Sequence, residues 1–306
     1  MHPEPQDDEH GVGKGATSII IVSYNTRDLL LACVESVYAS EGVPEPQVIV
    51  VDNASSDGSP GAVRDAFPRC VVIENAENTG FSKANNIGIE RATGDYVLLL
   101  NPDTVLQTDV LADMTEYMEN HPDVGMATCK LITGDGSLDL ACRRSFPSLW
   151  DGFCRAAGLS SLFPRSRLFA RYNLTFLDED ETNEVEAVNG AFMFCRREAI
   201  GRVGSLDEDY FMYIEDLDWC LRFRKAGWKV VYRPTSTTIH YKGKSGNPRS
   251  GRMIRELFKS TEIFYRKHRF PEISRSHRAC ILISLWLWKW TTLFLNALRR
   301  KKRTRP

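Results

Sequence analysis

The sequence lacks the features of a zinc-binding, secreted or repeat protein. Its eight cysteines are scattered along 306 residues and none forms a C-x-x-C pair, which argues against a structural zinc site. Residues 1–16 are polar and acidic and contain no apolar stretch, so we expect a disordered leader and no secretory signal. No internal repeat is evident. These absences predict a cytoplasmic globular protein with reduced thiols.

A glycine-rich phosphate loop after the first expected strand is also missing. The run Gly11-x-Gly13-x-Gly15 precedes that strand instead of following it, so it does not fit a phosphate loop. The segment that does follow the strand, Ser23-Tyr24-Asn25-Thr26, has none of the glycine and basic residues that sugar nucleotidyltransferases use there. A sugar nucleotidyltransferase therefore remains an alternative, although the loop motif of that enzyme class is missing from this sequence.

The net charge is close to zero, but the basic and acidic residues are unevenly distributed along the chain. The formal net charge is -1, yet residues 241–306 contain 18 Lys or Arg and only 3 Asp or Glu. Residues 1–240 hold the other 21 basic and 37 acidic residues. A basic tail predicts an anionic partner, such as phosphate groups or a membrane surface. No recognition motif for nucleic acid accompanies the tail, so we expect no nucleic-acid partner.

Apolar strand-like segments alternate with amphipathic helix-like segments through the first 130 residues. This order predicts an α/β fold with a doubly wound, mostly parallel sheet. Residues 131–186 are less regular, and we expect loops, a hairpin and short helices over one face. The ordered segments are strands at 18–22, 48–51, 70–73, 96–100, 124–129, 229–232 and 237–240, an apolar stretch at 188–194, and helices at 27–39, 58–67, 81–92, 110–120 and 215–226.

The segment from Gly94 to Asp103 reads as a buried strand that ends on a carboxylate. Tyr96–Leu100 is continuously apolar, and Pro102 cannot donate to a sheet ladder, so pairing stops there. Asp103 is thereby placed at the sheet edge where open α/β folds bind ligands. A carboxylate beside an oxygen-rich ligand suits Mg²⁺ or Mn²⁺. The alternative is that Asp103 or Thr104 caps the helix expected near Val110.

Polar residues also follow the second expected strand and open the third expected helix. Asp52 ends a strand and is suited to accept the N3–H of a pyrimidine base beside Tyr24, whereas Asp57 fits better as a turn former. The third helix begins near Phe81 with Lys83 in its first turn, which favours phosphate binding. Two adjacent amides, Asn85 and Asn86, are unusual so early in a helix, because Asn is a weak helix former.

Two further clusters suit acid–base and metal chemistry. Glu215, Asp216 and Asp218 occupy one helix start beside four aromatic residues. The helix dipole accounts for one or two of these carboxylates, and the third suggests a pocket with a general base. His240 ends a strand before a flexible basic loop at 241–249, so it is a candidate metal ligand below a loop that closes over a pyrophosphate.

Taken together, these motifs resemble family-2 glycosyltransferases of the GT-A fold, in the branch that includes bacterial rhamnosyltransferases of cell-envelope polysaccharide synthesis. The resemblance covers about residues 17–270. It departs from the common pattern at Asn101, where many members carry an acid. The motifs are Val22-Ser23-Tyr24-Asn25, Val51-Asp52-Asn53-Ala54-Ser55-Ser56-Asp57-Gly58, Asn78-x-Gly80-Phe81, Asn85-Asn86-x-Gly88, Asn101-Pro102-Asp103, Asn189-Gly190-Ala191 and Glu215-Asp216-x-Asp218.

The resemblance implies an inverting enzyme with a nucleotide-diphospho-sugar donor, a divalent cation (Mg²⁺ or Mn²⁺) and a glycan or polyprenyl-linked acceptor. Asp216 would be the catalytic base with Glu215 beside it, and Asp103 and His240 would be metal ligands. A non-catalytic sugar-nucleotide or membrane-binding scaffold is the other alternative. The remaining expected site residues are Tyr24, Asn25, Asp52, Asn78, Lys83, Asn85 and Asn101 for the donor, Asn189, Gly190 and Trp219 for the acceptor or sugar pocket, and Lys242, Lys244 and Ser245 for the lid.

The C-terminal segment Ala279–Leu298 is long enough to span a bilayer, but Lys289 and several hydroxyl residues argue against spanning. Its tryptophans and the basic run 299–303 fit a helix lying on the membrane surface. The alternatives are a spanning helix and a helix docked on the core. We therefore expect a leader at 1–16, a catalytic domain at 17–270 (nucleotide-binding half 17–130, acceptor half and lid 131–270) and an amphipathic basic segment at 271–306. Through 279–306 the protein would bind an anionic membrane, on the cytoplasmic face of the inner membrane.

Overall fold

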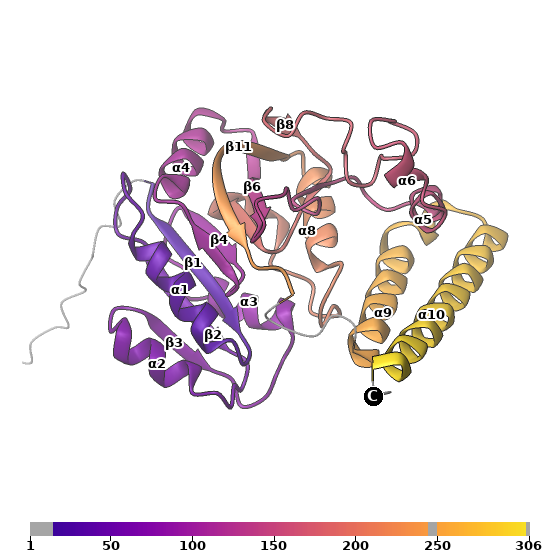
Figure 1. Ribbon diagram of the computed structural model, residues 1–306. Coiled ribbons are helices and arrows are strands. Elements are labelled where there is room, and N and C mark those ends of the chain that lie inside the picture. The colour runs from indigo at the N-terminus through magenta and orange to yellow at the C-terminus, as the bar shows by residue number, and fades with distance from the viewer. Residues whose placement is uncertain (1–14, 244–249, 304–306) are drawn as a thin grey trace, which may run out of the picture.

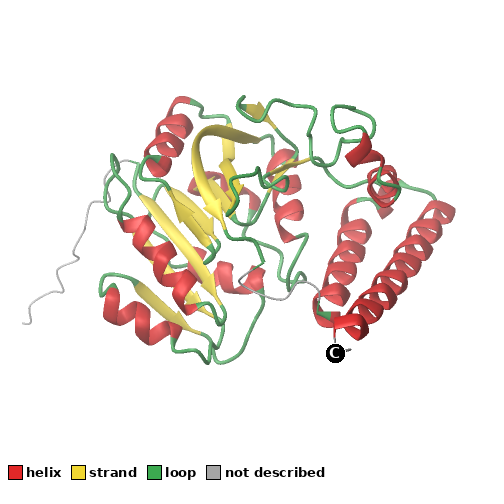
Figure 2. Ribbon diagram, in the orientation of Figure 1, coloured by secondary structure: helices red, strands yellow, loops and turns green. Residues whose placement is uncertain are grey.

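The computed structural model of the chain describes residues 15–243 and 250–303, and describes side chains as far as Ala297. A twisted mixed sheet lies at the centre with helices on both sides, and two long C-terminal helices stand side by side at one end of the molecule (Figures 1 and 2). The predicted α/β fold with C-terminal helices is confirmed.

The first half of the sheet is parallel and buried on both faces. Its strands lie in the order β3-β2-β1-β4, with every pairing parallel. Each residue of β4 is buried, as a strand covered by helices on both sides requires. The bounds are β1 (Thr17–Ser23), α1 (Arg27–Tyr38), β2 (Gln47–Asp52), α2 (Ser59–Ala66), β3 (Val71–Glu74), α3 (Phe81–Ile89) and β4 (Tyr96–Leu100).

The second half of the sheet mixes directions. β10 (Phe192–Arg196) runs antiparallel between β4 and β6 (Val124–Thr133), and β11 (Lys229–His240) pairs parallel with β6. β11 is a single strand with a register shift between Arg233 and Thr237, where two strands were expected. The short strand β5 (Thr104–Leu106), which was not expected, pairs antiparallel with the end of β11 and so brings Thr104 opposite His240.

This arrangement also shows that the capping interpretation of Asp103 was wrong. Helix α4 (Val110–Asn120) begins after Asp109, and no side chain caps its first turn. Asp103 instead lies in the tight connection between β4 and β5, with 1% of its surface exposed. Strand β5 explains the difference, because its pairing with β11 holds residues 104–106 extended, away from the helix start.

Residues 131–186 form the loops and short elements that were expected. Helix α5 begins with a capping box in which Ser148 and Asp151 bond reciprocally. β7 and β9 make a separate two-stranded sheet, and β8 pairs with β11. The bounds are β7 (Arg143–Arg144), α5 (Leu149–Ala156), α6 (Leu159–Leu162), β8 (Asn183–Glu184), β9 (Ala187–Val188), α7 (Arg197–Val203) and α8 (Glu215–Lys225).

Two antiparallel helices, α9 (Gly251–His268) and α10 (Arg275–Arg303), close the chain (Figure 1). A 3-10 turn at Phe270–Glu272 links them. Their shared cluster comprises Ile254, Phe258, Tyr265, Phe270, Ile281 and Leu285, separate from the main core. From α9, Phe264 is buried in the main core and Ile263 packs against that core. The boundary expected near residue 270 therefore falls inside this helical hairpin.

The eight cysteines are all free. Seven are buried, and Cys280 on α10 is exposed. Burial raises the pKa of the buried thiols, for example to about 12 for Cys33 and to about 11 for Cys70. A protonated, enclosed thiol is a poor nucleophile.

Candidate active site

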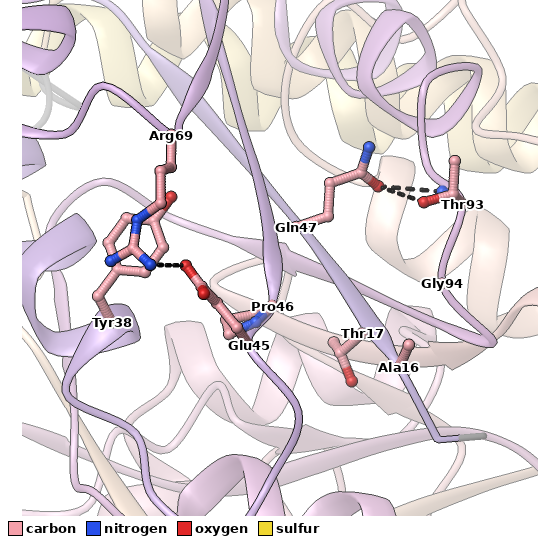
Figure 3. Close-up of a pocket in the computed structure, with 9 residues that line it drawn as sticks. All are labelled: Ala16, Thr17, Tyr38, Glu45, Pro46, Gln47, Arg69, Thr93 and Gly94. Atoms are coloured by element: carbon pink, nitrogen blue, oxygen red, sulfur yellow. Dashed lines mark hydrogen bonds and ion pairs between the residues drawn. The ribbon is translucent and has the colours of Figure 1, made fainter. Parts of the chain in front are cut away.

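The expected site residues gather at the carboxyl edge of the sheet, where β1, β2, β4 and β11 end. A hollow at the opposite edge is lined by Thr17, Gln47 and Gly94, which begin or precede three of the same strands (Figure 3). That hollow is closed on one side by the ion pair of Arg69 with Glu45. Open α/β sheets bind ligands at the carboxyl ends of their strands, so we place the active site away from this hollow.

Asp52 is the donor-side residue with the clearest free acceptor. Its side chain is 1% exposed, one carboxylate oxygen accepts the Ser55 amide at 2.7 Å, and within the described residues the other oxygen has no hydrogen-bond partner. A buried oxygen of this kind is costly unless a ligand donates to it. Tyr24 stands nearby on the loop after β1 with nearly half of its surface exposed.

The loops after β1 and β2 fix each other. Asn25 accepts the Ser56 amide at 2.8 Å, and its own amide donates to Ser55 Oγ at 2.8 Å. Asn25 and Ala54 both have a left-handed backbone, with φ of 54° and 62°. Residues other than glycine adopt this conformation at a cost, which the surrounding contacts must offset, and such strain gathers at functional sites.

The start of α3 is built around Gly80. Its φ is 86°, and an added Cβ would collide with the backbone of Phe211. The Phe81 amide donates to the Phe211 carbonyl at 2.7 Å, and Asn78 accepts the Gly80 amide at 3.0 Å. Lys83 is exposed in this first turn, and its contact with a phosphate stays a prediction.

The two amides of α3 face inward instead. Asn85 is 1% exposed and donates to the Phe81 carbonyl at 2.9 Å. Asn86 donates to the Leu206 carbonyl and accepts the Leu206 amide, both at 2.9 Å. Asn86 therefore ties α3 to the segment at Leu206, whereas the Asn85 bond lies within the helix.

A buried polar cluster joins the ends of β4 and β11. His240 Nε2 lies 3.4 Å from Asp103 Oδ1, and His240 Nδ1 lies 3.0 Å from Asp139. Lys242 donates to Asp139 at 2.7 Å. Burial lowers the pKa of His240, but hydrogen bonding to the two carboxylates outweighs it and raises the pKa to about 9. Burial likewise opposes ionisation of Asp139, yet the bonds from His240 and Lys242 hold its pKa well below the usual range.

A second buried cluster lies at the start of α8. Asp216 accepts from Arg144 Nη2 at 2.5 Å and from the Gly190 amide at 3.2 Å. Both side chains of the ion pair are about one-tenth exposed. Desolvation lowers the pKa of the Arg144 guanidinium, but the adjacent Asp216 carboxylate outweighs it and raises the pKa. Glu215 is buried without a partner for Oε2 among the described residues, and desolvation followed by repulsion from Asp216 raises its pKa to about 8.

The turn that enters α8 is strained. Tyr213 and Ile214 have φ of 69° and 72°, and Ile214 is β-branched, which makes a left-handed backbone especially unfavourable. The same turn begins after Met212, whose carbonyl accepts Ser260 Oγ of α9 at 2.9 Å. The position of Glu215 and Asp216 therefore depends on a backbone that its neighbours constrain.

Two residues of the same helix serve packing. Asp218 is held by Arg222 at 2.8 Å and by His268 of α9 at 2.6 Å. Trp219 is fully buried, donates to the Gly204 carbonyl at 2.9 Å and packs edge-on against Phe223. We therefore omit Trp219 from the proposed pocket, since its ring is enclosed by the core.

A chain of contacts connects the two clusters. Asn189 Nδ2 lies 3.5 Å from Asp139 Oδ2, and the next residue, Gly190, donates to Asp216. Asn101 is tied to the same segment, because its amide donates to the Ala191 carbonyl at 3.0 Å. Asp103, His240, Asn189, Gly190 and Asp216 are thus brought together as expected. Lys244 and Ser245, expected in the lid, lie outside the described residues.

Sequence reasoning missed Asp139 and Arg144. Both belong to the irregular stretch after β6, which carries no strand or helix period that would place them. The available signal was chemical: two adjacent arginines, Arg143 and Arg144, fall among apolar residues and so needed buried acceptors. Arg143 meets the carbonyl of Leu177 at 2.9 Å, and Arg144 meets Asp216.

The protein offers few ligands for a divalent cation at this edge of the sheet. Within residues 15–243 and 250–303, no group of three or more His, Cys, Asp or Glu side chains is arranged to enclose a metal. Asp103 and His240 nevertheless offer an oxygen and a nitrogen donor a short distance apart. Mg²⁺ is commonly bound by one or two carboxylates together with substrate phosphates, so this donor set fits a cation that arrives with a diphosphate.

Three comparisons with known proteins agree with this geometry. The sequence model of the family described as Glycosyl transferase family 2 matches residues 18–204. The N-acetylglucosaminyl-diphospho-decaprenol L-rhamnosyltransferase of Mycobacterium tuberculosis is 31% identical over 228 residues, covering 71% of this chain and 73% of that protein. Rhamnosyltransferase WbbL of Escherichia coli K12 is 27% identical over 255 residues, covering 79% and 90%.

Solved structures show the same fold. The mannosyltransferase PcManGT from Pyrobaculum calidifontis, in complex with GDP-Man and Mn²⁺, superposes with a TM-score of 0.58 at 19% identity. The match covers 95% of this chain and 76% of that one. GalNAc-T7 with UDP, GalNAc and Mn²⁺ superposes with a TM-score of 0.57 at 15% identity, covering 82% and 48%.

Proposed function

We propose, from the premise that this chain belongs to glycosyl transferase family 2, that it transfers a sugar from a nucleoside-diphosphate donor to a glycan or polyprenyl-linked acceptor in cell-envelope polysaccharide synthesis. Rhamnose is the first candidate sugar, because two relatives are named rhamnosyltransferases. The observation that carries the proposal is the line of buried contacts from Asp103 through His240 and Asp139 to Asn189, and from Gly190 to Asp216. It joins a candidate diphosphate site to a candidate base.

The donor would enter over the ends of β1 and β2. The open oxygen of Asp52 would accept the N–H of a pyrimidine base, and the exposed ring of Tyr24 would flank that base. Asn25 and Asn78 shape the loops on either side through their backbone contacts. Lys83 and the start of α3 would face the phosphates, where a helix N-terminus and a cation both favour negative charge.

Asp216 would act as the general base. Transfer with inversion requires that the acceptor hydroxyl lose a proton as its oxygen attacks the anomeric carbon from the face opposite the leaving diphosphate. Arg144 donates to one oxygen of the Asp216 carboxylate and so fixes its direction. Glu215, with its raised pKa, holds a proton near neutral pH and is the second candidate for proton transfer.

Asp103 and His240 would hold a divalent cation, which when bound supplies charge neutralisation for the diphosphate that departs. Asp139 would accept the Nδ1 proton of His240, and Nε2 would lose its own proton to serve as a ligand beside Asp103. Lys242 donates to the same carboxylate, so a lid beginning at this residue would start next to the proposed cation.

The experiment that tests the function measures transfer or slow hydrolysis with a panel of nucleoside-diphosphate sugars that includes a rhamnose donor, with and without chelator. We expect turnover of at least one donor, loss of turnover with chelator, and recovery with Mg²⁺ or Mn²⁺. Formation of a sugar nucleotide from a sugar phosphate would indicate the nucleotidyltransferase alternative. Donor binding without turnover would indicate a scaffold. Full turnover with excess chelator would remove the cation from the mechanism.

A polyprenyl-linked acceptor would place the enzyme beside a membrane, and we propose that residues 279–306 bind the anionic cytoplasmic surface of the inner membrane. Helix α10 is long and apolar enough over Arg275–Ala297 to cross a bilayer by length and composition alone. In the structure, however, one side of it packs on α9 through Ile281 and Leu285. Trp286, Trp290 and Phe294 stay more than half exposed, as expected for the lipid side of a helix lying on the surface.

A further inference from the structure

A second exposed apolar surface lies next to the exposed apolar side of helix α10. Helices α5 and α6 and the loop to Leu168 lie at the same end of the molecule as α9 and α10, away from β3 (Figure 1). Phe153 is 55% exposed, Leu162 70% and Leu168 58%. Scattered single apolar residues are normal at protein surfaces, but a contiguous group of this size marks an interaction site.

The exposed aromatics of this segment form one cluster. Trp150 packs against Phe153 with ring centres 5.6 Å apart and against Phe169 at 6.2 Å. Phe163 packs on Phe169 at 5.4 Å. The indole N–H of Trp150 donates to the Leu168 carbonyl at 2.9 Å, which ties the helix to the returning loop. The exposed rings are therefore held in place from both ends of the segment.

The aromatic cluster meets α10 directly. A Cβ added at Gly152 of α5 would lie 4.0 Å from the ring of Trp288, so the indole rests against the α5 backbone. Trp288 in turn packs edge-on against Phe258 of α9, with centroids 5.4 Å apart. Because Trp288 is still half exposed, it bridges the two apolar surfaces. We use the name docking surface for residues 149–169 together with the exposed side of α10.

Charge identifies the partner of this surface. Residues 152–177 contain four arginines and no Asp or Glu, and residues 273–306 contain nine Lys or Arg and no Asp or Glu. Arg155, Arg165 and Arg167 are exposed. The acidic run that follows, 178–181, is held by Lys130 through Glu179 and Asp180. The single carboxylate of residues 149–169, Asp151, is buried and paired with Arg171. Exposed aromatics framed by cations match an anionic lipid surface, where aromatic rings enter the headgroup region and each basic residue adds attraction.

We propose that α5, α6 and α10 dock together on an anionic bilayer, so that membrane binding depends on the insertion 149–169 as much as on the tail. The identity of the acceptor rests on the proposed function, whereas the binding to a membrane does not depend on it. α5 follows Arg144 by only a few residues, and Tyr265 of α9 donates to the intervening Pro147 carbonyl at 3.4 Å. Docking through α5 would therefore hold the Asp216 side of the active site near the membrane plane, where a lipid-linked acceptor lies.

The test compares flotation of the full chain with vesicles of phosphatidylcholine containing phosphatidylglycerol. The variants are Phe153→Glu and Leu162→Glu, whose side chains are exposed and contribute little to folding. Val71→Glu is the matched control, because Val71 is 42% exposed on β3, away from the docking surface (Figure 1). We expect each α5 or α6 variant to reduce the bound fraction at least threefold at low salt, and Val71→Glu to bind like the wild type.

Three outcomes would overturn the proposal. If Phe153→Glu and Leu162→Glu float like the wild type while deletion of 279–306 abolishes binding, α10 acts alone. If the wild type binds phosphatidylcholine vesicles equally well and without salt dependence, the partner is not anionic. If the wild type does not float and instead forms a dimer that the two variants dissociate, the surface binds a second copy. Hydrolysis of a nucleotide sugar, measured in parallel, distinguishes failure of docking from failure of the proposed function.

Discussion

Strand β4 is continuously apolar and the middle of helix α10 is largely apolar, but the two segments end in opposite environments. Every residue of β4 is buried, between β1 on one side and β10 on the other. α10 buries only a stripe that includes Ile281 and Leu285, and leaves three tryptophans half exposed or more. The contacts that cover β4 come from the same chain, whereas α10 has more apolar surface than α9 can cover.

This comparison separates two uses of apolar residues. In the sheet, apolar residues specify the fold and position polar groups at the strand ends. Asp52 and Asp103 are therefore held by strands that are already buried within the chain. In α10, apolar residues form a surface that α9 leaves partly exposed. The chemistry and the proposed docking should therefore respond independently to mutation, and the following predictions test that independence.

The largest expected effect is at the proposed base. Asp216→Asn should reduce turnover about 10²- to 10⁴-fold, since it removes the proton acceptor while keeping the shape of the side chain. Donor affinity and vesicle flotation should stay near the wild-type values. Steady-state kinetics with flotation of the same preparation measures both properties. Transfer within threefold of the wild type would exclude Asp216 as the base and direct attention to Glu215.

Asp218→Asn is the matched control for that experiment. Its carboxylate is on the same helix but is engaged by Arg222 and His268. We expect it to lower the melting temperature and to leave turnover per folded molecule almost unchanged. Equal losses of turnover in both variants would show that helix α8, and not a particular carboxylate, was disturbed.

The next effect concerns cation binding. Asp139→Asn should weaken Mn²⁺ affinity about 10- to 100-fold, because a carboxylate that orients a ligating histidine is typically worth that much. Titration of Mn²⁺ in the presence of nucleoside diphosphate measures this without relying on catalysis. Asp180→Asn, an exposed carboxylate on Lys130, is the control and should bind Mn²⁺ normally. Unchanged affinity in Asp139→Asn would separate Asp139 from the metal site.

The contrast between sheet and hairpin also predicts two different stability losses. Leu99→Ala in β4 should cost about 3–5 kcal/mol and lower the global melting transition, because Leu99 is fully buried in the main core. Leu285→Ala should cost nearer 2 kcal/mol, since its cluster is small and partly exposed. Hydrogen exchange should report local opening of α9 and α10 in Leu285→Ala, with protection of β4 retained. Loss of protection in β4 as well would show that hairpin and sheet unfold as one unit.

The smallest effect depends on pH. Glu215 has a raised pKa of about 8 in the folded protein against 4.5 for the ordinary group, so folding favours its protonated form. Above pH 4.5 the unfolded chain releases this proton, and stability falls as pH rises toward 8. Glu215→Gln should therefore match the wild type near pH 4.5 and melt about 2 °C or more higher at pH 8.5. An equal difference at both pH values would mean that Glu215 does not titrate in this range.

Much of the first half of the sheet could be predicted from the sequence, because each strand there is short, apolar and followed by polar residues at the sheet edge. The helix at 110–120 was predicted at its observed bounds, and the ends of β2 and β4 placed Asp52 and Asp103 where they were expected. The errors arose where pairing partners are distant in sequence. β5 exists only because β11 pairs with it, and Asp139 meets His240 across 101 residues of chain. Hydrophobic periodicity along the sequence reflects only neighbouring residues, so it cannot predict such contacts.

The cysteine distribution has a practical consequence for following α10. Because seven thiols are buried and Cys280 is exposed near the start of that helix, a maleimide reagent should modify the native protein at Cys280 first. A fluorophore attached there would lie about one helical turn from Ile283, one of the apolar side chains that the wild-type protein leaves exposed. The chain thus carries its own attachment point for an optical reporter, and its emission would shift as the local polarity changes.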